Sequence, residues 1–232
     1  MTKTRKISLA VVSVLLSALL AVSVVMTFRE LSARQKEKED FAELAELVQI
    51  EQPEQPQPDE PNSPADDEPE PAHRRDLAPL FAQNSDCIGW ICVHDTVIDY
   101  PVMHTPNDPQ KYLRRNFYSE YSQSGVPFLD YRCSPDSGDL LIYGHNMKNG
   151  TMFSDLKKYL DADFLSSHQT IELQIANSLY RYTVTEIKVT DTSDKWYEDI
   201  GKNLFENKRF LVLSTCYGGG NGRLLIIAVK DN

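Results

Sequence analysis

The sequence predicts a mainly β domain, a barrel or a sandwich, that follows one membrane-spanning helix and an acidic, proline-rich linker. Three observations support this fold class. Residues 7–28 carry no charge, residues 51–73 are rich in proline and acids, and residues 74–232 contain short apolar runs separated by turn residues. The chain therefore divides into an anchor over 1–28, a stalk and linker over 29–73, and a folded domain over 74–232.

The anchor is expected to be an uncleaved transmembrane helix. From Ile7 to Phe28 the chain runs 22 residues without a charge, and a helix of that length, at about 1.5 Å per residue, crosses a bilayer core. Three basic residues precede it, Lys3, Arg5 and Lys6. The positive-inside rule then places the N-terminus in the cytoplasm and the domain outside the cell. A cleaved signal peptide is the alternative, but its apolar region is only about 7 to 15 residues long.

The segment between anchor and domain is expected to be a helical stalk followed by an extended spacer. Residues 29–49 are mostly polar or charged, with four apolar residues at helical spacing: Phe41, Leu44, Leu47 and Val48. Residues 51–73 hold eight acids and seven prolines, without a lysine or arginine. Such a segment buries too little apolar surface to fold, and its prolines and charges keep it extended.

The negative charge belongs mainly to this N-terminal third. Residues 1–73 contain 7 Lys and Arg against 14 Asp and Glu, a net charge of −7. Residues 74–232 contain 17 against 20, a net charge of −3, which completes the −10 of the whole chain. A nearly neutral domain without a basic stripe gives no reason to expect nucleic acid as a partner.

The folded domain is predicted to consist of strands with a few helices. Residues 74–87 place Leu77, Leu80 and Phe81 on one helical face. A β-rich stretch follows over 90–100, and five further runs are predicted to be strands: 139–144, 170–175, 179–189, 210–215 and 223–229. Between the first two of these runs, residues 151–160 show the pattern of an amphipathic helix on the sheet, formed by Met152, Phe153, Leu156, Tyr159 and Leu160.

The domain contains four cysteines, Cys87, Cys92, Cys133 and Cys216, an even number that is compatible with disulfides outside the cell. Cys87 and Cys92 are too close to staple a long loop, and their odd spacing points them to opposite faces of a strand. Buried thiols are the preferred interpretation for the first three cysteines. Zinc bound by Cys87, Cys92 and His94 is a weaker alternative, because the C-x-x-C spacing of structural zinc sites is absent. No metal or cofactor is therefore expected.

Cys216 ends an apolar run, and six residues that include four glycines separate it from Arg223. The pair Asn221 and Gly222 is typical of a tight hairpin turn. If the flanking runs are antiparallel neighbours, the hairpin brings the thiol and the guanidinium together. Simple burial is the alternative for a free cysteine. A phosphate-binding loop is disfavoured, since the following helix and the lysine of such loops are missing.

A thiol with an ordinary pKa of about 8.5 needs a partner that removes its proton or stabilises the thiolate. His145 is the candidate among the five histidines, because it follows an apolar strand through a glycine and enters a polar loop. Scaffolds present side chains to clefts at such places. The other four lie in the linker or in polar surroundings: His73, His94, His104 and His168.

Two motifs carry a resemblance to a known family. The stretch "YGHNMKNGTMF", with His145, and "LSTC", with Cys216 and then Arg223, strongly resemble the sortases, the membrane-anchored cysteine transpeptidases of Gram-positive bacteria. The resemblance extends to "GWICVHDTVIDYPV" and "YLRRNFYSEYSQSGVPFLDYR" and covers nearly all of residues 80–230. The helix after the histidine loop and the helical N-terminal stretch are similar to class B. Val212 departs from the usual TLxTC pattern, and residues 190–209 are short for the class B insertion.

The resemblance implies a closed eight-stranded β-barrel with catalytic His145, Cys216 and Arg223. Cys216 would attack a threonine carbonyl in the C-terminal sorting motif of a secreted protein, and an amine of a peptidoglycan cross-bridge or a pilin would resolve the thioacyl enzyme. Arg223 would hold the substrate or stabilise the oxyanion, and Thr215 would orient the substrate or complete the oxyanion hole. Four further residues become candidates for the peptide groove, with ordinary barrel packing as the alternative for each: Tyr143, Ser214, Trp196 and Tyr197.

Two other functional classes remain as alternatives. A papain-like protease uses the same groups, but its cysteine precedes its histidine, whereas here His145 precedes Cys216. A tethered binding module without catalysis explains the anchor, the spacer and the β domain, yet does not require His145, Cys216 and Arg223 together. Both are less well supported than a single-pass transpeptidase of the cell membrane with its catalytic domain outside the cell.

Overall fold

The computed structural model describes residues 3–48, 74–136, 138–200 and 209–231. The chain divides into two units, Met1–Glu43 and Leu44–Asn232. The proposed proline-rich spacer over 51–73 lies outside the described residues.

The N-terminal unit belongs to one long helix, α1 (Lys3–Leu47), which contains the whole of the proposed anchor. Among the described residues this is the one helix that is long and apolar enough to cross a membrane. Its large apolar side chains from Val12 to Phe28 are half or more exposed. Exposed apolar side chains over this described stretch are the pattern expected of a surface that faces lipid.

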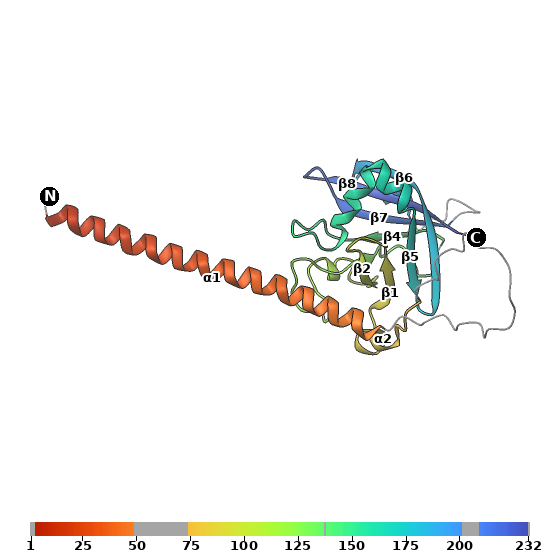
Figure 1. Ribbon diagram of the computed structural model, residues 1–232, viewed down its shortest axis with the longest axis horizontal. Helices are drawn as coiled ribbons and strands as arrows, with labels where there is room; N and C mark the ends of the chain where they lie inside the picture. Colours follow the sequence, from red (N-terminus) through yellow and green to blue (C-terminus); the bar gives the residue numbers. More distant parts are fainter. Residues whose placement is uncertain (1–2, 49–73, 137, 201–208, 232) are drawn as a thin grey trace, which may run out of the picture. The chain divides into compact units, whose positions relative to one another are not determined.

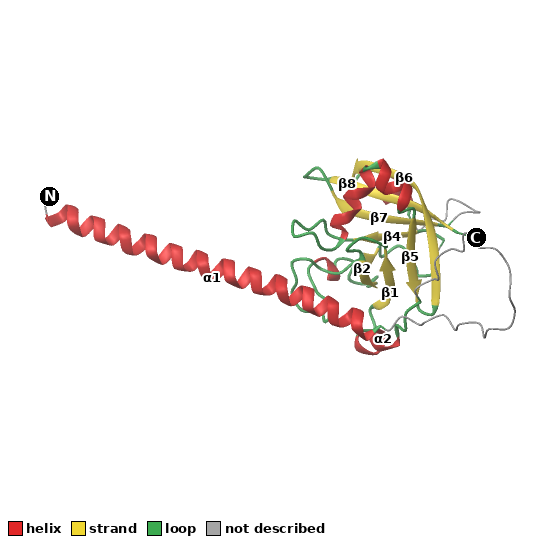
Figure 2. Cartoon of the chain, viewed as in Figure 1, coloured by secondary structure: helices red, strands yellow, loops and turns green. Residues whose placement is uncertain are grey.

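The second unit contains a closed barrel of eight strands (Figures 1 and 2), as the resemblance implies. Around the barrel the order is β1, β2, β3, β4, β7, β8, β6 and β5, and β5 closes back on β1. In chain order the strands are β1 (Cys87–Cys92), β2 (Asp99–Met103), β3 (Phe128–Leu129), β4 (Leu140–Tyr143), β5 (Thr170–Ile175), β6 (Ser178–Asp191), β7 (Phe210–Cys216) and β8 (Gly222–Lys230).

The continuous apolar runs of the sequence form the most buried strands of this barrel. In β7, every residue from Phe210 to Thr215 is buried, and in β8 so is every residue from Leu224 to Ala228. One face of each strand points into the barrel, while η2 (Phe153–Leu160) packs against both strands from outside. Burial on both faces explains why these strands lack the polar alternation of a half-exposed sheet.

Short helices occupy the connections between strands. They are α2 (Ala78–Gln83), η1 (Lys111–Leu113), η2, α3 (Ala162–Ser167) and α4 (Lys195–Asp199). The predicted helix over 151–160 is present as η2, but it is a 3₁₀-helix rather than an α-helix. With three residues per turn, Phe153, Leu156 and Tyr159 share the buried side. Leu160 does not, and it is 45% exposed, which corrects its place in the predicted apolar face.

All four cysteines are free thiols, and three of them lie in or near the core. Cys87 and Cys133 are buried, as predicted, and burial raises the pKa of each thiol to about 12. Cys92 is only half-buried, but burial and then the Asp99 carboxylate raise its pKa to about 12 as well. Cys216 alone among the four is exposed. The thiols other than Cys216 are therefore poor nucleophiles.

Candidate active site

Two neighbouring parallel strands bring the candidate base and nucleophile to the same rim of the barrel. Strands β4 and β7 pair in parallel, with Tyr143 opposite Ser214. His145 follows Tyr143 by two residues, and Cys216 follows Ser214 by two. Because paired parallel strands end at the same edge of a sheet, the two side chains emerge together although they are far apart in the sequence.

The hairpin after β7 places an arginine directly beside the cysteine, as predicted. Strands β7 and β8 are antiparallel, and Cys216 pairs with Arg223. Three consecutive glycines, 218 to 220, turn the chain with φ of +72°, +84° and +56°, a backbone that side chains rarely adopt. At Gly222 a Cβ atom would lie 2.1 Å from the carbonyl oxygen of Tyr217, so only glycine fits this close approach.

Three hydrogen bonds to backbone carbonyls fix the histidine loop to the nucleophile strand. The Thr215 hydroxyl donates to the Gly144 carbonyl (2.7 Å), and the Gly144 amide donates to the Ser214 carbonyl (3.1 Å). Beyond them, the Asn146 side-chain amide donates to the Cys216 carbonyl (2.8 Å). Sequence reasoning did not single out Asn146, although it stands next to His145 in the quoted motif. Through these bonds the positions of both reactive residues are fixed by their main chain.

The half-buried His145 ring is oriented by a carbonyl, and an aromatic residue packs against the glycine that precedes it. Its Nε2 lies 2.9 Å from the Leu113 carbonyl oxygen, and since a carbonyl only accepts, Nε2 carries the proton and Nδ1 is left as the base. On the other side of the loop, the Phe153 ring packs so closely against Gly144 that a Cβ there would lie 2.4 Å from it.

Electrostatics favour the neutral form of this imidazole. Burial lowers the pKa of His145 below its ordinary value, and the positive charge of Arg114 acts in the same direction. The hydrogen bond to Leu113 opposes both but does not outweigh them. His145 is therefore uncharged at neutral pH and able to accept a proton.

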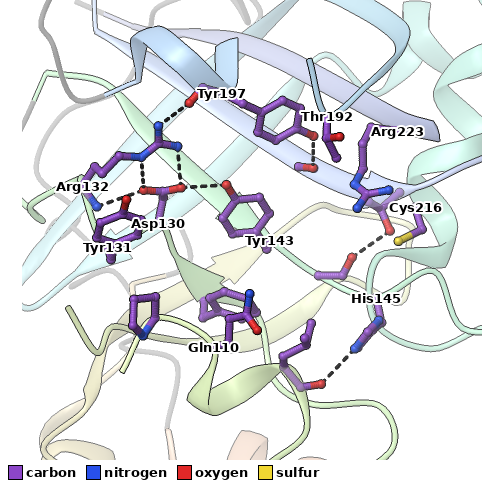
Figure 3. A pocket seen from close by; sticks show the side chains of 16 residues that line it. Gln110, Asp130, Tyr131, Arg132, Tyr143, His145, Thr192, Tyr197, Cys216 and Arg223 are labelled. Carbon is purple, nitrogen blue, oxygen red and sulfur yellow. Dashed lines mark hydrogen bonds and ion pairs between the residues drawn. The ribbon is translucent and has the colours of Figure 1, made fainter. Parts of the chain in front are cut away.

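The cysteine and the arginine keep their reactive atoms available. No hydrogen bond from a described residue reaches Cys216 Sγ, and the Arg223 guanidinium lies beside it in Figure 3. One arginine nitrogen, Nη1, donates to the Gly222 carbonyl (2.9 Å). The Tyr217 amide, the first backbone donor after the nucleophile, is already bonded to the same carbonyl (3.0 Å). The guanidinium of Arg223 has five N–H groups and therefore keeps hydrogens to spare beside the sulfur.

A cavity of about 370 Å³ opens in front of these three residues and contains four of the five predicted groove residues in its lining. Those four are Tyr143, Tyr197, Ser214 and Thr215. Figure 3 shows His145, Cys216 and Arg223 at one end, which we call the catalytic end, and Asp130, Tyr131 and Arg132 at the other, the far end. Among the described residues, no three His, Cys, Asp or Glu side chains group as metal ligands.

Trp196 is the fifth predicted groove residue, and the structure places it elsewhere. It is 8% exposed, and its ring meets the Phe210 ring edge-on at 5.3 Å. Because consecutive residues of the short helix α4 point in different directions, Trp196 enters the core while Tyr197 lines the cavity. Core packing, the alternative given for Trp196 from the sequence, is what the structure shows.

Sequence reasoning missed the polar cluster at the far end. Asp130 is 3% exposed and accepts hydrogen bonds from Arg132 Nε (2.8 Å), Arg132 Nη2 (2.9 Å) and the Tyr143 hydroxyl (2.7 Å). Burial by itself raises the pKa of this carboxyl, but the bonds from Arg132 and Tyr143 together outweigh burial and hold it below its ordinary value. The stretch "FLDYR" was part of the resemblance, yet nothing in it marked these two residues as cavity residues.

Comparison with known proteins agrees with this geometry. A family model described as the sortase domain matches residues 91–231, more than half of the chain. The chain belongs to the sortase family. Sortases are cysteine transpeptidases, and the sortase match spans both strands that carry His145 and Cys216 as well as the hairpin to Arg223.

The relatives of this sortase are of class B. It is 40% identical over 126 residues to sortase B of Listeria monocytogenes, covering 53% of this chain and 50% of the relative. To sortase B of Staphylococcus aureus it is 28% identical over 145 residues, covering 60% and 59%. The chain thus spans about half to three fifths of these curated relatives. The crystal structure of sortase B from B. anthracis matches with a TM-score of 0.64 and 26% identity, covering 86% of this chain and 98% of that one.

Proposed function

We propose that this sortase is a membrane-anchored class B transpeptidase that cleaves a C-terminal sorting motif in secreted proteins and transfers them to an amine. One observation carries the proposal. An exposed cysteine pairs with an arginine across a hairpin, at the same barrel rim as a neutral histidine and beside a cavity large enough for a peptide segment.

The first half-reaction forms a thioester. His145 Nδ1 takes the proton of the Cys216 thiol, and the sulfur attacks the carbonyl carbon of a threonine in the sorting motif. The tetrahedral intermediate then collapses and the carbon–nitrogen bond of the scissile peptide breaks. His145, now an imidazolium, gives its proton to the leaving amine. The C-terminal fragment departs, and the secreted protein stays on Cys216 as a thioacyl group.

The second half-reaction reverses these roles. A primary amine attacks the thioester carbon, His145 takes a proton from the attacking nitrogen, and the sulfur leaves to become the thiol again. A peptidoglycan cross-bridge and a pilin lysine are the two candidate acceptors. We favour the cross-bridge, which makes wall anchoring the outcome of the reaction.

Arg223 stabilises the oxyanion in both halves. The donors of the two residues that flank Cys216 in the chain are already used, since the Tyr217 amide bonds Gly222 and the Thr215 hydroxyl bonds Gly144. Thr215 therefore serves to join the two strand ends rather than to complete an oxyanion hole. The planar guanidinium keeps further N–H groups, and charge-assisted bonds to a developing oxyanion are stronger than neutral ones.

The N-terminal helix fixes where the reaction takes place. We propose that α1 crosses the membrane once through Ile7–Phe28, with Lys3, Arg5 and Lys6 in the cytoplasm. The barrel is then outside the cell, and residues 51–73 act as the spacer between them. Substrates that arrive by secretion and amines of the cell wall meet on this side of the membrane.

Product analysis tests the proposal against its alternatives. Full-length protein in detergent micelles is incubated with a library of quenched sorting-motif peptides, with and without a primary amine. A ligated product that requires the amine supports a transpeptidase and also identifies the motif. Hydrolysis with no ligated product at any amine concentration would identify a protease, and binding without either product would identify a binding module.

A further inference from the structure

The far end of the cavity contains a circuit of hydrogen bonds, closed by one ring-stacking contact, that no step of the proposed reaction uses. Asp130 binds Arg132 and Tyr143, as described above. From Arg132, Nη1 donates to the backbone carbonyl of Tyr197, and the Tyr197 hydroxyl lies 2.6 Å from the Ser214 hydroxyl. The Tyr143 and Tyr197 rings stack at 6.3 Å with planes 5° apart, which closes the circuit (Figure 3). We call these five residues the Asp130 circuit.

The circuit joins the short helix α4 to two paired strands of the barrel. Tyr143 ends β4 and Ser214 lies in β7, the two strands that lead to the catalytic residues. Tyr197 belongs to α4, a helix of only five residues in the connection from β6 to β7. A helix this short is not stable by itself. Its position therefore depends on the contacts that hold it.

Several contacts hold α4, and one of them is the hydrogen bond from Arg132. Asp194 caps the helix by accepting from the Trp196 amide (3.0 Å), and the Trp196 ring packs in the core. Neither contact involves the side chain of Tyr197, the residue of α4 that lines the cavity. Tyr197 itself is held by the bond from Arg132 to its carbonyl, by the bond between its hydroxyl and Ser214, and by its stacking on Tyr143.

The geometry of Arg132 requires a guanidinium. Nε and Nη2 bind the two carboxylate oxygens of Asp130 side by side, and Nη1 is then directed at Tyr197. A lysine can neutralise the same carboxylate with its single nitrogen, but it cannot also reach the carbonyl. Charge pairing with Asp130 and support of α4 are therefore separable by one substitution.

We propose that the Asp130 circuit positions Tyr197 as a wall of the peptide subsite, so that Arg132 controls how tightly the sorting peptide binds. Arg132 touches none of the reacting atoms and is a positioning residue. Arg132 shapes the subsite that holds the peptide. This binding stabilises the enzyme–peptide complex and the transition state by the same amount. Loss of the circuit raises KM and leaves kcat unchanged. This inference rests on the proposed function for its substrate, a peptide.

Arg132→Lys in the full-length protein is the test, with Arg181→Lys as a matched control. Arg181 likewise places Nε against a buried carboxylate, that of Glu172 (3.3 Å), with 28% of its side chain exposed against 31% for Arg132. Glu172 lies in β5, away from the cavity. We expect Arg132→Lys to raise KM about tenfold, the size of one lost hydrogen bond, with kcat within about twofold. Arg181→Lys leaves both constants unchanged.

Amide hydrogen exchange of residues 195–200 gives a readout that needs no turnover. Faster exchange of these amides in Arg132→Lys, but not in Arg181→Lys, supports the circuit. This readout holds even if the wild-type protein forms no ligated product, and in that case only the proposed function fails. A fall in kcat at constant KM, equal losses in both arginine variants, or unchanged KM and exchange would each overturn the inference. If Arg132→Lys does not fold, Ser214→Ala cuts the circuit on its other side and must give the same rise in KM.

Discussion

At the catalytic end of the cavity the main chain is fixed and the side chains stay available, whereas at the far end the side chains themselves are bound to one another. Cys216 has an unbonded sulfur, and His145 keeps Nδ1 free to accept a proton. The Asp130 carboxylate, by contrast, receives four hydrogen bonds. The difference follows from what each end must do. Reactive atoms need unused bonding capacity, while a binding wall needs a fixed shape.

The same contrast separates the four cysteines. Burial raises the pKa of Cys87, Cys92 and Cys133 to about 12, which removes them as nucleophiles at neutral pH. Cys216 is exposed at a strand end beside a guanidinium. The fold therefore selects one thiol for reactivity by position alone. Substitutions at the catalytic end are expected to lower kcat, and substitutions at the far end to raise KM.

The largest effect is expected at the nucleophile. Cys216→Ala removes the atom that carries the acyl group, and we expect kcat to fall by about 10⁴-fold or more. The exposed strand end accommodates alanine, so the thermal unfolding midpoint should stay within about 2 °C of wild type. Cys92→Ala is the matched control and should keep its activity. Comparable losses in both variants would mean that the contrast among the cysteines is not functional.

His145→Ala is expected to be the next most severe change, with kcat lower by about 10²- to 10⁴-fold, because proton removal and leaving-group protonation both depend on this ring. Steady-state turnover of the quenched peptide measures the loss. Addition of imidazole to the variant should restore part of the rate, since a small base fits the space that the ring leaves. Turnover equal to that of wild type would exclude His145 as the base.

Arg223→Lys separates geometry from charge at the catalytic end. The substitution keeps the positive charge beside Cys216 but loses the planar fork, so kcat should fall by about 10²-fold, the scale of a lost oxyanion donor. The hairpin itself should be unaffected, because Gly222 and the three preceding glycines set its shape. A variant that is folded and turns over at the wild-type rate would reduce Arg223 to a nearby charge.

The acid side of the pH profile reports the protonation of His145. Burial lowers its folded pKa below the ordinary value of 6.5, so the active neutral form persists to lower pH than for an exposed histidine. Activity, measured as kcat/KM, should be retained at pH 6.5 and fall about tenfold per unit only below the lowered pKa. The contribution of His145 to the free energy of unfolding should also decrease as pH falls. The reason is that its pKa is higher in the unfolded chain, which therefore binds the proton first. An acid limb centred above 6.5 would contradict the assignment.

The smallest effect is expected from Tyr143→Phe at the far end. The variant keeps the ring that stacks on Tyr197 but loses the bond to Asp130, while Arg132 still pairs with the carboxylate. We expect KM to rise by about two- to fivefold with kcat unchanged, since one of several bonds in the circuit is lost. Steady-state kinetics over a range of peptide concentrations separates the two constants. A change confined to kcat would show that Tyr143 acts on the chemistry instead.

How much the sequence predicts depends on how local the determining contacts are. The strands β7 and β8 and their hairpin follow from apolar runs and a glycine-rich turn, which are adjacent in the chain, so the pairing of Cys216 with Arg223 was predictable. The 3₁₀ character of η2 was not, because periods of 3.0 and 3.6 residues differ too little over ten residues to be told apart. Strand β3, Phe128–Leu129, is too short to leave any periodic pattern.

The far end could not be derived from the sequence because the contact that ties it to α4 is distant in the chain. Arg132 and Tyr197 are 65 positions apart, and the bond between them depends on the placement of α4. The same placement decided the role of Trp196, which the resemblance had put in the groove with its neighbour. Which of two consecutive aromatic residues faces the cavity is set by the orientation of a single helical turn, and no residue pattern encodes that.

The central claim is that Cys216 carries the acyl group between the two half-reactions. Full-length protein is mixed with the cleavable peptide without an amine, quenched in acid within seconds, and analysed by mass spectrometry after digestion. We expect the peptide that contains Cys216 to gain the mass of the N-terminal cleavage fragment, and this adduct to disappear, with formation of ligated product, when a primary amine is added before the quench. Cleavage without any adduct on Cys216, or an adduct that the amine does not discharge, would contradict the account.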